Sequence, residues 1–324
     1  MSHRVTRPDH HVLGVLVVGV LILLAPASAR ANTFVVTKTA DTNDGVCDSD
    51  CSLREAIIAA NANAGADIIT LPAGTYTLTI AGANEDSAAT GDLDITGDLT
   101  INGAGSATTI IDGGALDRVF DIIGSVTVAL NDLTVRNGLS GSGNGGGIAI
   151  PGPGVATVTI TRCTVSGNHA SNGSGTGIYN NSSNLTITNS TVSGNIATAS
   201  GDGAGIYNNL TLTITNSTIS GNSSTPSGDG GGINNNSTLT ITDSTISGNT
   251  AGTGDGGGIY NFDTATITNS TISGNSTPNG DGGGIWNNFT LMITDSTISG
   301  NSAFDGGGLL DNGSAIITST TIAS

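Results

Sequence analysis

The sequence LTITNSTISGN, residues 212–222, recurs in close copies along the second half of the chain. The copies end at Asn168, Asn195, Asn222, Asn249, Asn275 and Asn301, so successive steps are 27, 27, 27, 26 and 26 residues. A fixed period of this length is typical of arrays in which each unit buries its apolar face only against its neighbours. The chain is therefore predicted to be a repeat protein.

Within one unit the residues alternate as they do in β-strands. Leu212, Ile214 and Ile219 fall on one side, and threonines and a serine fall on the other. A second short strand is expected after the glycines, at residues 259–261. No helical segment fits inside the period, which excludes a leucine-rich repeat. Each repeat is predicted to be one rung of an all-β parallel β-helix, with rungs about 4.8 Å apart.

The region before the repeats predicts a short helix. Ser52 and Glu55 have the spacing of a capping box at the start of a helix. Apolar residues then follow at helical spacing, and an amphipathic helix ahead of a solenoid is the element that covers the open end of its core. We therefore expect an N-terminal helical cap. The apolar positions are Leu53, Ala56, Ile57 and Ala60.

The first 31 residues have the features of a signal peptide. Arg4 and Arg7 precede an apolar run over residues 12–25, and small residues at 27–31 offer cleavage sites. The run is shorter than the roughly 20 residues that span a membrane. We predict an exported protein, secreted or at the cell surface. Its expected parts are a signal peptide (1–31), a capping region with the first coils (32–140) and a repeat β-helix with coils of 24–28 residues (141–324).

Charge restricts the partners. The chain carries a formal net charge of −17, and no lysine or arginine follows Arg162. Polyanions are bound by neutralising their charges with lysine and arginine. Nucleic acid, heparin-like chains and anionic lipid are therefore expected to be poor partners unless cations bridge them.

The three cysteines have different expected roles. Cys47 and Cys51 flank the turn before the predicted helix and, in an exported protein, can form a small disulfide. Cys163 takes the place that Ser190 and Ser217 occupy in later repeats. We interpret Cys163 as a buried, inert thiol.

The residues around this helix resemble a known signature. The resemblance is to CSLREA-domain proteins, which are secreted or surface β-helices of bacteria. It rests on residues 44–47 (DGVC) and 51–57 (CSLREAI), and it continues through residues 91–95, 118–120 and 133–138. The later repeats are similar to those of polymorphic outer-membrane proteins, with Gly257-Gly258-Ile259 as one motif and residues 272–275 as the other, where Ile272 replaces the family's phenylalanine. The resemblance implies a right-handed β-helix and surface display or adhesion at the outer membrane.

Two polar rows recur at fixed phase. The asparagine row that ends the repeats follows glycine at a turn, and we interpret it as structural, with amides bonded between rungs. The second row lies inside Gly-Asp-Gly turns, where stacked carboxylates repel unless a cation such as calcium lies between them. Aspartate is also simply a good turn residue. This candidate metal row is Asp202, Asp229, Asp255, Asp281 and Asp305.

An aromatic row is the best candidate for ligand binding. Tyr179, Tyr207, Tyr260 and Trp286 each follow an inward isoleucine, so alternation points their rings outward. Such a strip can stack on sugar rings of a polysaccharide or cell-surface glycan, with Asn208, Asn261 and Asn287 holding the sugar's polar edges. The alternative is that the rings stack on one another and join the rungs.

Paired threonines suggest a remote alternative. They recur at 186/188, 213/215, 240/242 and 266/268 and form a flat hydroxyl grid that resembles ice-binding solenoids. Threonine is also favoured in strands by propensity alone.

A secreted polysaccharide lyase or glycoside hydrolase is the main rival function. Asp92 and Asp94, two apart on a strand, place two carboxylates on one face about 7 Å apart, a distance suited to acid–base work on a glycosidic bond. The same pair equally suits an exposed acidic edge, which the resemblance favours. If the chain is an enzyme, Asp92, Asp94, Arg118 and Arg162 are the residues to test.

The sequence thus favours a non-catalytic, exported, surface-associated β-helix that is adhesin-like or structural. No cofactor other than calcium is expected. The last coil ends at Ser324 without a cap, and an open β-helix edge pairs readily with another chain. We expect either a truncated reading frame or end-to-end self-association.

Overall fold

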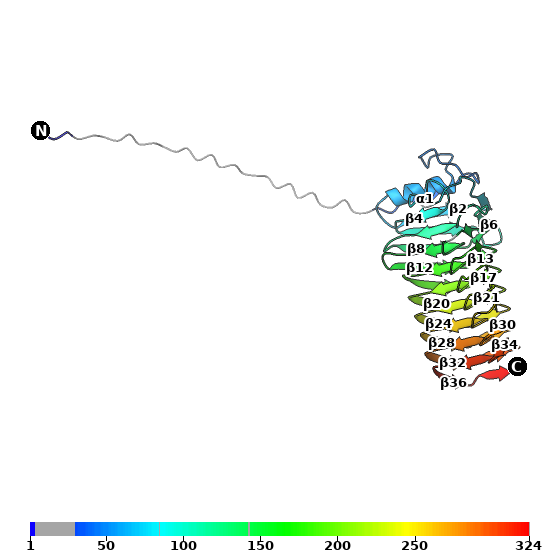
Figure 1. Ribbon diagram of the computed structural model, residues 1–324. Coiled ribbons are helices and arrows are strands. Elements are labelled where there is room, and N and C mark those ends of the chain that lie inside the picture. Colours follow the sequence, from blue (N-terminus) through cyan, green and yellow to red (C-terminus); the bar gives the residue numbers. More distant parts are fainter. Residues whose placement is uncertain (4–29, 84, 142, 324) are drawn as a thin grey trace.

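The computed structural model describes residues 1–3, 30–83, 85–141 and 143–323. The chain winds from β1 (Thr33–Val35) to β37 (Thr321–Ala323) into a solenoid, with the helix α1 (Leu53–Ala62) at one end and the C-terminus at the other (Figure 1). The predicted signal peptide falls mainly on residues 4–29, outside the described residues. In the described part of the chain, no helix combines the length and apolar character needed to cross a membrane.

One repeat coil contains four strands, each in a different sheet. β20 (Thr211–Thr215), β21 (Thr218–Ser220), β22 (Ser223–Ser224) and β23 (Ile233–Asn235) complete the circuit, and β24 (Thr238–Thr242) begins the next coil. β24 pairs with β20 in parallel, with Leu212 opposite Leu239. Residues one repeat apart therefore lie directly above one another, as the period predicts. The predicted parallel β-helix is confirmed.

Two long sheets run along the solenoid. The eleven-stranded sheet contains β1, β2 (Asp67–Leu71), β5 (Leu99–Gly103), β8 (Thr127–Asn131), β12 (Ala156–Thr161), β16 (Ser183–Thr188), β20, β24, β28 (Thr264–Thr268), β32 (Thr290–Thr294) and β36 (Ser314–Thr318). The ten-stranded sheet contains β3 (Gly74–Thr77), β6 (Thr109–Asp112), β9 (Thr134–Arg136), β13 (Thr164–Ser166), β17 (Thr191–Ser193), β21, β25 (Thr245–Ser247), β29 (Thr271–Ser273), β33 (Thr297–Ser299) and β37. The eleven-stranded sheet is continuous across residue 140, the predicted boundary between the capping region and the repeats, because β8 pairs with β12.

Two further sheets close each coil. The nine-stranded sheet contains β4 (Leu93–Ile95), β7 (Phe120–Ile122), β11 (Ile148–Ile150), β15 (Ile178–Asn180), β19 (Ile206–Asn208), β23, β27 (Ile259–Asn261), β31 (Ile285–Asn287) and β35 (Leu309–Asp311). The seven-stranded sheet contains β10 (Leu139–Ser140), β14 (His169–Ala170), β18 (Ile196–Ala197), β22, β26 (Thr250–Ala251), β30 (Ser276–Asp281) and β34 (Ser302–Asp305).

The core is built from columns of aliphatic residues. Alternation along each strand turns one residue in two inward, and parallel register places the inward residues of successive coils in contact. Ile214, Ile241, Ile267 and Ile293 form one such column, and all four are fully buried. Because each coil buries its apolar side chains against the next, stability accumulates along the axis.

The predicted asparagine row is a buried ladder. Asn195 Nδ2 donates to Asn222 Oδ1 at 2.9 Å, and the Asn195 backbone N–H donates to the same oxygen at 3.1 Å. The other Nδ2 hydrogen of Asn195 reaches the Val165 carbonyl. The left-handed backbone at this turn belongs to the preceding glycine (Gly221, φ +62°), not to the asparagine. The asparagine is selected for its amide hydrogen bonds.

A second asparagine ladder lies inside the nine-stranded sheet. The side chains of Asn208, Asn261 and Asn287 are fully buried, and Asn261 Nδ2 donates to Asn287 Oδ1 at 2.7 Å. The sequence-based interpretation of these three amides as outward sugar contacts is wrong. Tyrosine and asparagine are neighbours on a strand, so an outward ring requires an inward amide.

The N-terminal helix has the predicted capping box. Ser52 Oγ accepts a hydrogen bond from the Glu55 backbone N–H, and Glu55 Oε2 accepts one from the Ser52 N–H. The buried side of α1, which includes Ile57, packs against β1, β2 and β4. A disulfide joins Cys47 to Cys51, whose Cα atoms are 4.4 Å apart. Whether the helix acts as a cap for the core stays a prediction.

Candidate functional site

The aromatic row lies on the outward face of the nine-stranded sheet. Tyr179 and Tyr207 form one stacked pair with ring centroids 5.2 Å apart, and Tyr260 and Trp286 form a second pair at 4.5 Å with nearly parallel planes. All four rings are half-buried. In each pair, one face of each ring packs on its partner along the solenoid axis, so that face is not free for a sugar.

The two stacked pairs are separated by Asn234. Asn234 lies between Tyr207 and Tyr260 in the register of the sheet and is 2% exposed. Its Oδ1 has no hydrogen-bond partner among the described residues. The row is therefore two aromatic stacks with a polar gap, not a continuous strip.

A groove beside this row was not identified from the sequence. Phe262 and Phe289 lie at the turns between the nine-stranded and eleven-stranded sheets, and their side chains are 51% and 58% exposed. Together with Asn236 and Asp263 they line an open groove of about 230 Å³. The Asn236 side chain also lies close enough to Tyr207 to offset part of the rise that burial causes in the pKa of Tyr207. The groove and the aromatic row are thus connected.

A departure from the repeat could have revealed these phenylalanines. The position after the buried asparagine is Asn181, Asn209 or Asn236 in three coils, and it becomes Phe262 in the next. A single exposed apolar residue is ordinary, but Phe262 and Phe289 line the same groove, and contiguous exposed apolar patches mark binding sites. Sequence reasoning followed the regular rows and overlooked the exceptions.

The predicted metal row lies beside the aromatic row. Asp229 Oδ1 accepts a hydrogen bond at 2.8 Å from the backbone N–H of Asp255, and this pattern repeats at Asp202 and Asp255. Burial raises the pKa of Tyr260 to about 12, with a smaller contribution from the nearby carboxylates of Asp229 and Asp255. Among the described residues, no three carboxylates of this row gather within 4.8 Å. A calcium site here stays a prediction.

The paired threonines lie on the outward face of the eleven-stranded sheet. Thr213 and Thr215 are half-buried and aligned with Thr240 and Thr242 of the next coil. In β32 the row is interrupted by Met292, which is 43% exposed. Ice binding stays a prediction.

The candidate catalytic carboxylates are buried in the first coils. Asp92 is 2% exposed and Asp94, on β4, is fully buried. The interpretation of this pair as an exposed acidic edge is wrong, because the chain around residues 85–92 and the next coil cover it. Arg118 Nε donates to Asp92 Oδ2 at 2.5 Å. Arg162 is not part of this group and instead pairs with Asp132.

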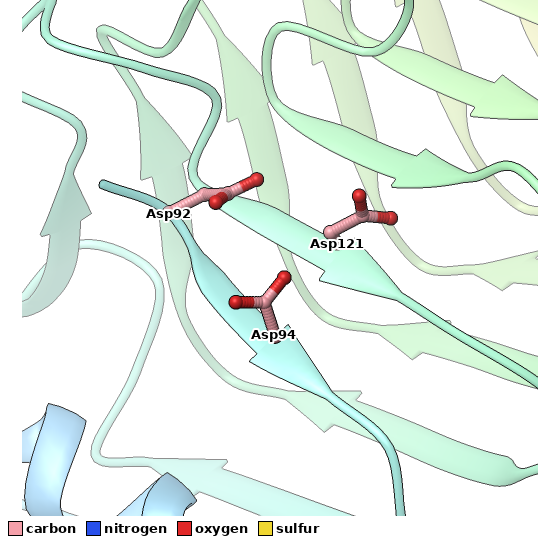
Figure 2. Close-up of side chains that lie close together, drawn as sticks. All are labelled: Asp92, Asp94 and Asp121. Atoms are coloured by element: carbon pink, nitrogen blue, oxygen red, sulfur yellow. The ribbon is translucent and has the colours of Figure 1, made fainter. Parts of the chain in front are cut away.

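A third carboxylate completes the group. Asp121 of β7 pairs with Asp94 of β4 in parallel register and is 5% exposed. Figure 2 shows the side chains of Asp92, Asp94 and Asp121 gathered on one side of these two strands. One oxygen from each carboxylate lies within 4.8 Å of the others. Asp121 follows Asp94 by 27 residues, the same step as in the regular repeats, so the spacing could have predicted this meeting, but the period was not extended to the coils before residue 141.

Burial controls the protonation of the three carboxyl groups. It raises the pKa of Asp92 to about 7 and that of Asp94 to about 7, and it raises that of Asp121 to about 6. The Arg118 guanidinium opposes this rise at Asp92 and Asp121, and the Ala88 backbone N–H opposes it at Asp94. Groups with such values can exchange protons near neutral pH.

Comparisons with known proteins agree with the solenoid. A family model described as a right handed beta helix region matches residues 122–323. Among solved structures, pectate lyase Pel9A has a TM-score of 0.53 at 16% identity, with 92% of this chain and 79% of that chain covered. The A-module of the mannuronan C-5 epimerase AlgE4 of Azotobacter vinelandii has a TM-score of 0.41 at 20% identity, with coverages of 87% and 93%. No curated protein sequence matches the chain.

Proposed function

We propose that this chain, which belongs to the right-handed β-helix family, is a non-catalytic binding protein that presents a glycan-binding groove on the side of its solenoid. We further propose that it is exported and acts at the cell surface. The groove at Phe262 and Phe289 is the observation that carries this proposal, since it combines exposed aromatic rings with polar groups.

The groove chemistry fits a sugar ring. The C–H face of a pyranose packs on an aromatic ring, and its hydroxyls need hydrogen-bond partners at the edge. Phe262 and Phe289 offer the rings, and Asn236 and Asp263 offer an amide and a carboxylate. The groove is smaller than the pockets of roughly 300–1,000 Å³ that enclose drug-sized ligands. It therefore suits one or two units along a chain rather than an enclosed oligosaccharide.

Charge selects the class of glycan. Asp263 lines the groove, and no basic residue follows Arg162 in the sequence. A uronic acid polymer would meet carboxylates without a cation to neutralise it. We therefore propose a neutral glycan as the ligand.

Affinity electrophoresis of the protein in gels that contain a neutral polysaccharide or polygalacturonate tests the proposal. We expect retardation by at least one neutral polymer such as a β-glucan, and loss of this retardation in Phe262→Ala and Phe289→Ala. Phe304→Ala is the matched control, because Phe304 is 78% exposed but does not line the groove. Retardation that survives both groove substitutions, or that polygalacturonate alone produces, would contradict the proposal.

A polysaccharide-acting enzyme is the second candidate. The pKa values of about 7 at Asp92 and Asp94, with Arg118 beside them, favour it because a general acid or base works best near ambient pH. Their burial opposes it, since a reacting sugar must touch the carboxylates. An assay for new chain ends released from the same polysaccharides decides whether the chain is an enzyme. Turnover that Asp94→Asn abolishes would establish the enzyme and overturn the non-catalytic account.

A further inference from the structure

The cluster of three carboxylates in the first coils is incompletely neutralised. Asp92, Asp94 and Asp121 lie together, Asp117 is near enough to raise the pKa of Asp92 and Asp121, and Arg118 supplies the positive charge. Removing uncompensated charge from water is costly, so such a cluster either takes up protons or binds a cation. The negative charge of these aspartates therefore exceeds the single positive charge of the Arg118 guanidinium.

The hydrogen bonds divide the oxygens of these carboxylates into two sets. Asp92 Oδ2 accepts from Arg118, and Asp121 Oδ2 lies 3.5 Å from Arg118 Nη1. Asp94 Oδ2 accepts from the Ala88 N–H at 2.6 Å. Asp94 Oδ1 and Asp121 Oδ1 are buried and have no partner among the described residues. Each of these two carboxylates is held through one oxygen while the other is left for a ligand.

We propose that Asp92, Asp94 and Asp121 bind one divalent cation of the calcium type between the coils of β4 and β7. Two oxygens on the same Ca²⁺ ion, each at about 2.4 Å, are at most about 4.8 Å apart, and the three carboxylates meet this limit. Carboxylate oxygens are hard ligands, and calcium accepts irregular geometry more readily than magnesium does.

The ion would act on the structure of the first coils. It joins β4 to β7 and, through Asp94, holds Ala88 and the chain segment before Asp92. The backbone carbonyls of Ala88, Gly91 and Asp92 in turn accept hydrogen bonds from Arg54 of α1. The site therefore connects the N-terminal helix with the first coils.

Equilibrium dialysis of the protein against calcium chloride at pH 8 tests the site directly. We expect about one Ca²⁺ per chain, with the dissociation constant in or below the range of about 10⁻⁴–10⁻³ M typical of extracellular modules. Asp94→Asn and Asp121→Asn should each weaken binding at least about 10-fold. Asp229→Asn, in the aspartate row, is the matched control and should bind as the unaltered protein does. No binding at millimolar calcium, or a loss confined to Asp229→Asn, would overturn the proposal.

Thermal unfolding gives a second readout that does not depend on one variant. In chelator, Asp94→Asn should melt at a higher temperature than the unaltered protein, because it removes a buried charge. Calcium should raise the melting temperature of the unaltered protein, so that the order of the two is reversed. If Asp94→Asn does not fold, Asp121→Asn serves in its place. A calcium effect that is equal in the variant and the unaltered protein would contradict the site.

Discussion

The first coils and the repeat coils satisfy their buried polar groups by different means. In the first coils, buried or half-buried charges pair individually, as Arg54 does with Asp41 and Arg118 with Asp92. In the repeat coils, neutral amides form ladders in which each asparagine bonds to the next, as Asn195 does to Asn222. The first arrangement is specific to one place, and the second can be repeated with the coil.

This difference follows from the physics of stacking. A charged residue repeated at rung spacing would meet its own charge about 4.8 Å away, and like charges repel at that distance. An amide repeated at the same spacing meets a donor with an acceptor. Amide ladders therefore suit the interior of the regular coils, whereas the buried charges lie in the irregular ones, where α1 and the covering segment provide unique partners. The half-buried aspartate row of the regular coils instead accepts hydrogen bonds from backbone N–H groups of the next coil.

The largest expected effect is at the buried arginine of the first coils. Arg54 is fully buried, forms an ion pair with Asp41 at 2.7 Å and donates to three backbone carbonyls. Arg54→Ala leaves Asp41 and these carbonyls unpaired, so urea unfolding should show a loss of about 3–5 kcal/mol. It also tests whether α1 caps the core, because Arg54 joins the helix to the first coils.

Arg162→Asn is the matched control. Arg162 is exposed at φ +54°, a backbone angle that Asn189 adopts in the next coil, so the substitution removes an ion pair without backbone strain. It should unfold at nearly the same urea concentration as the unaltered protein. Equal losses in the two variants would show that buried charge is not what distinguishes the first coils.

A smaller effect is expected at the middle of a ladder. Asn222→Ala removes the acceptor of two Asn195 donors, the backbone N–H and Nδ2, which become unpaired in a dry interior. Urea unfolding should show a loss of about 2–3 kcal/mol. Asn209→Ala, which removes an exposed amide bond to Asn181, should cost much less. Similar losses for both variants would mean that the ladder adds no more than a surface contact.

The smallest effect is a pH dependence that belongs to the first coils alone. The pKa values of Asp92 and Asp94 are raised to about 7 in the folded chain, above their usual value near 4, so the folded state holds protons that the unfolded state releases. This contribution is present at low pH and is lost as pH rises through about 7. Without divalent cations, stability should fall between pH 5.5 and pH 8 by at least about 1.4 kcal/mol, the equivalent of one pKa unit. Asp94→Asn should flatten the urea-midpoint profile, and an unchanged slope would contradict this assignment.

The regular half of the molecule was predictable because its period determines its register. Once Leu212 and Leu239 are one coil apart, the inward isoleucines, the asparagine ladder and the outward tyrosines follow from alternation. The site was less predictable. Phe262 and Phe289 depart from the repeat, and Asp94 and Asp121, although one 27-residue step apart, lie before the regular repeats, where the period was not followed. The burial of Asp92 and the inward direction of Asn208 were not recognised. The repeat period gives the register of the coils, but it does not show which side chains other parts of the chain bury.

Hydrogen exchange followed by mass spectrometry tests most directly whether buried charge is confined to the first coils. Amide protection should be measured at pH 6 and pH 8 in chelator, corrected for intrinsic rates, and again at pH 8 with calcium. We predict that protection over residues 85–122 falls at pH 8 and returns with calcium, while residues 185–300 stay unchanged. A change spread evenly along the solenoid, or confined to the repeat coils, would contradict the account.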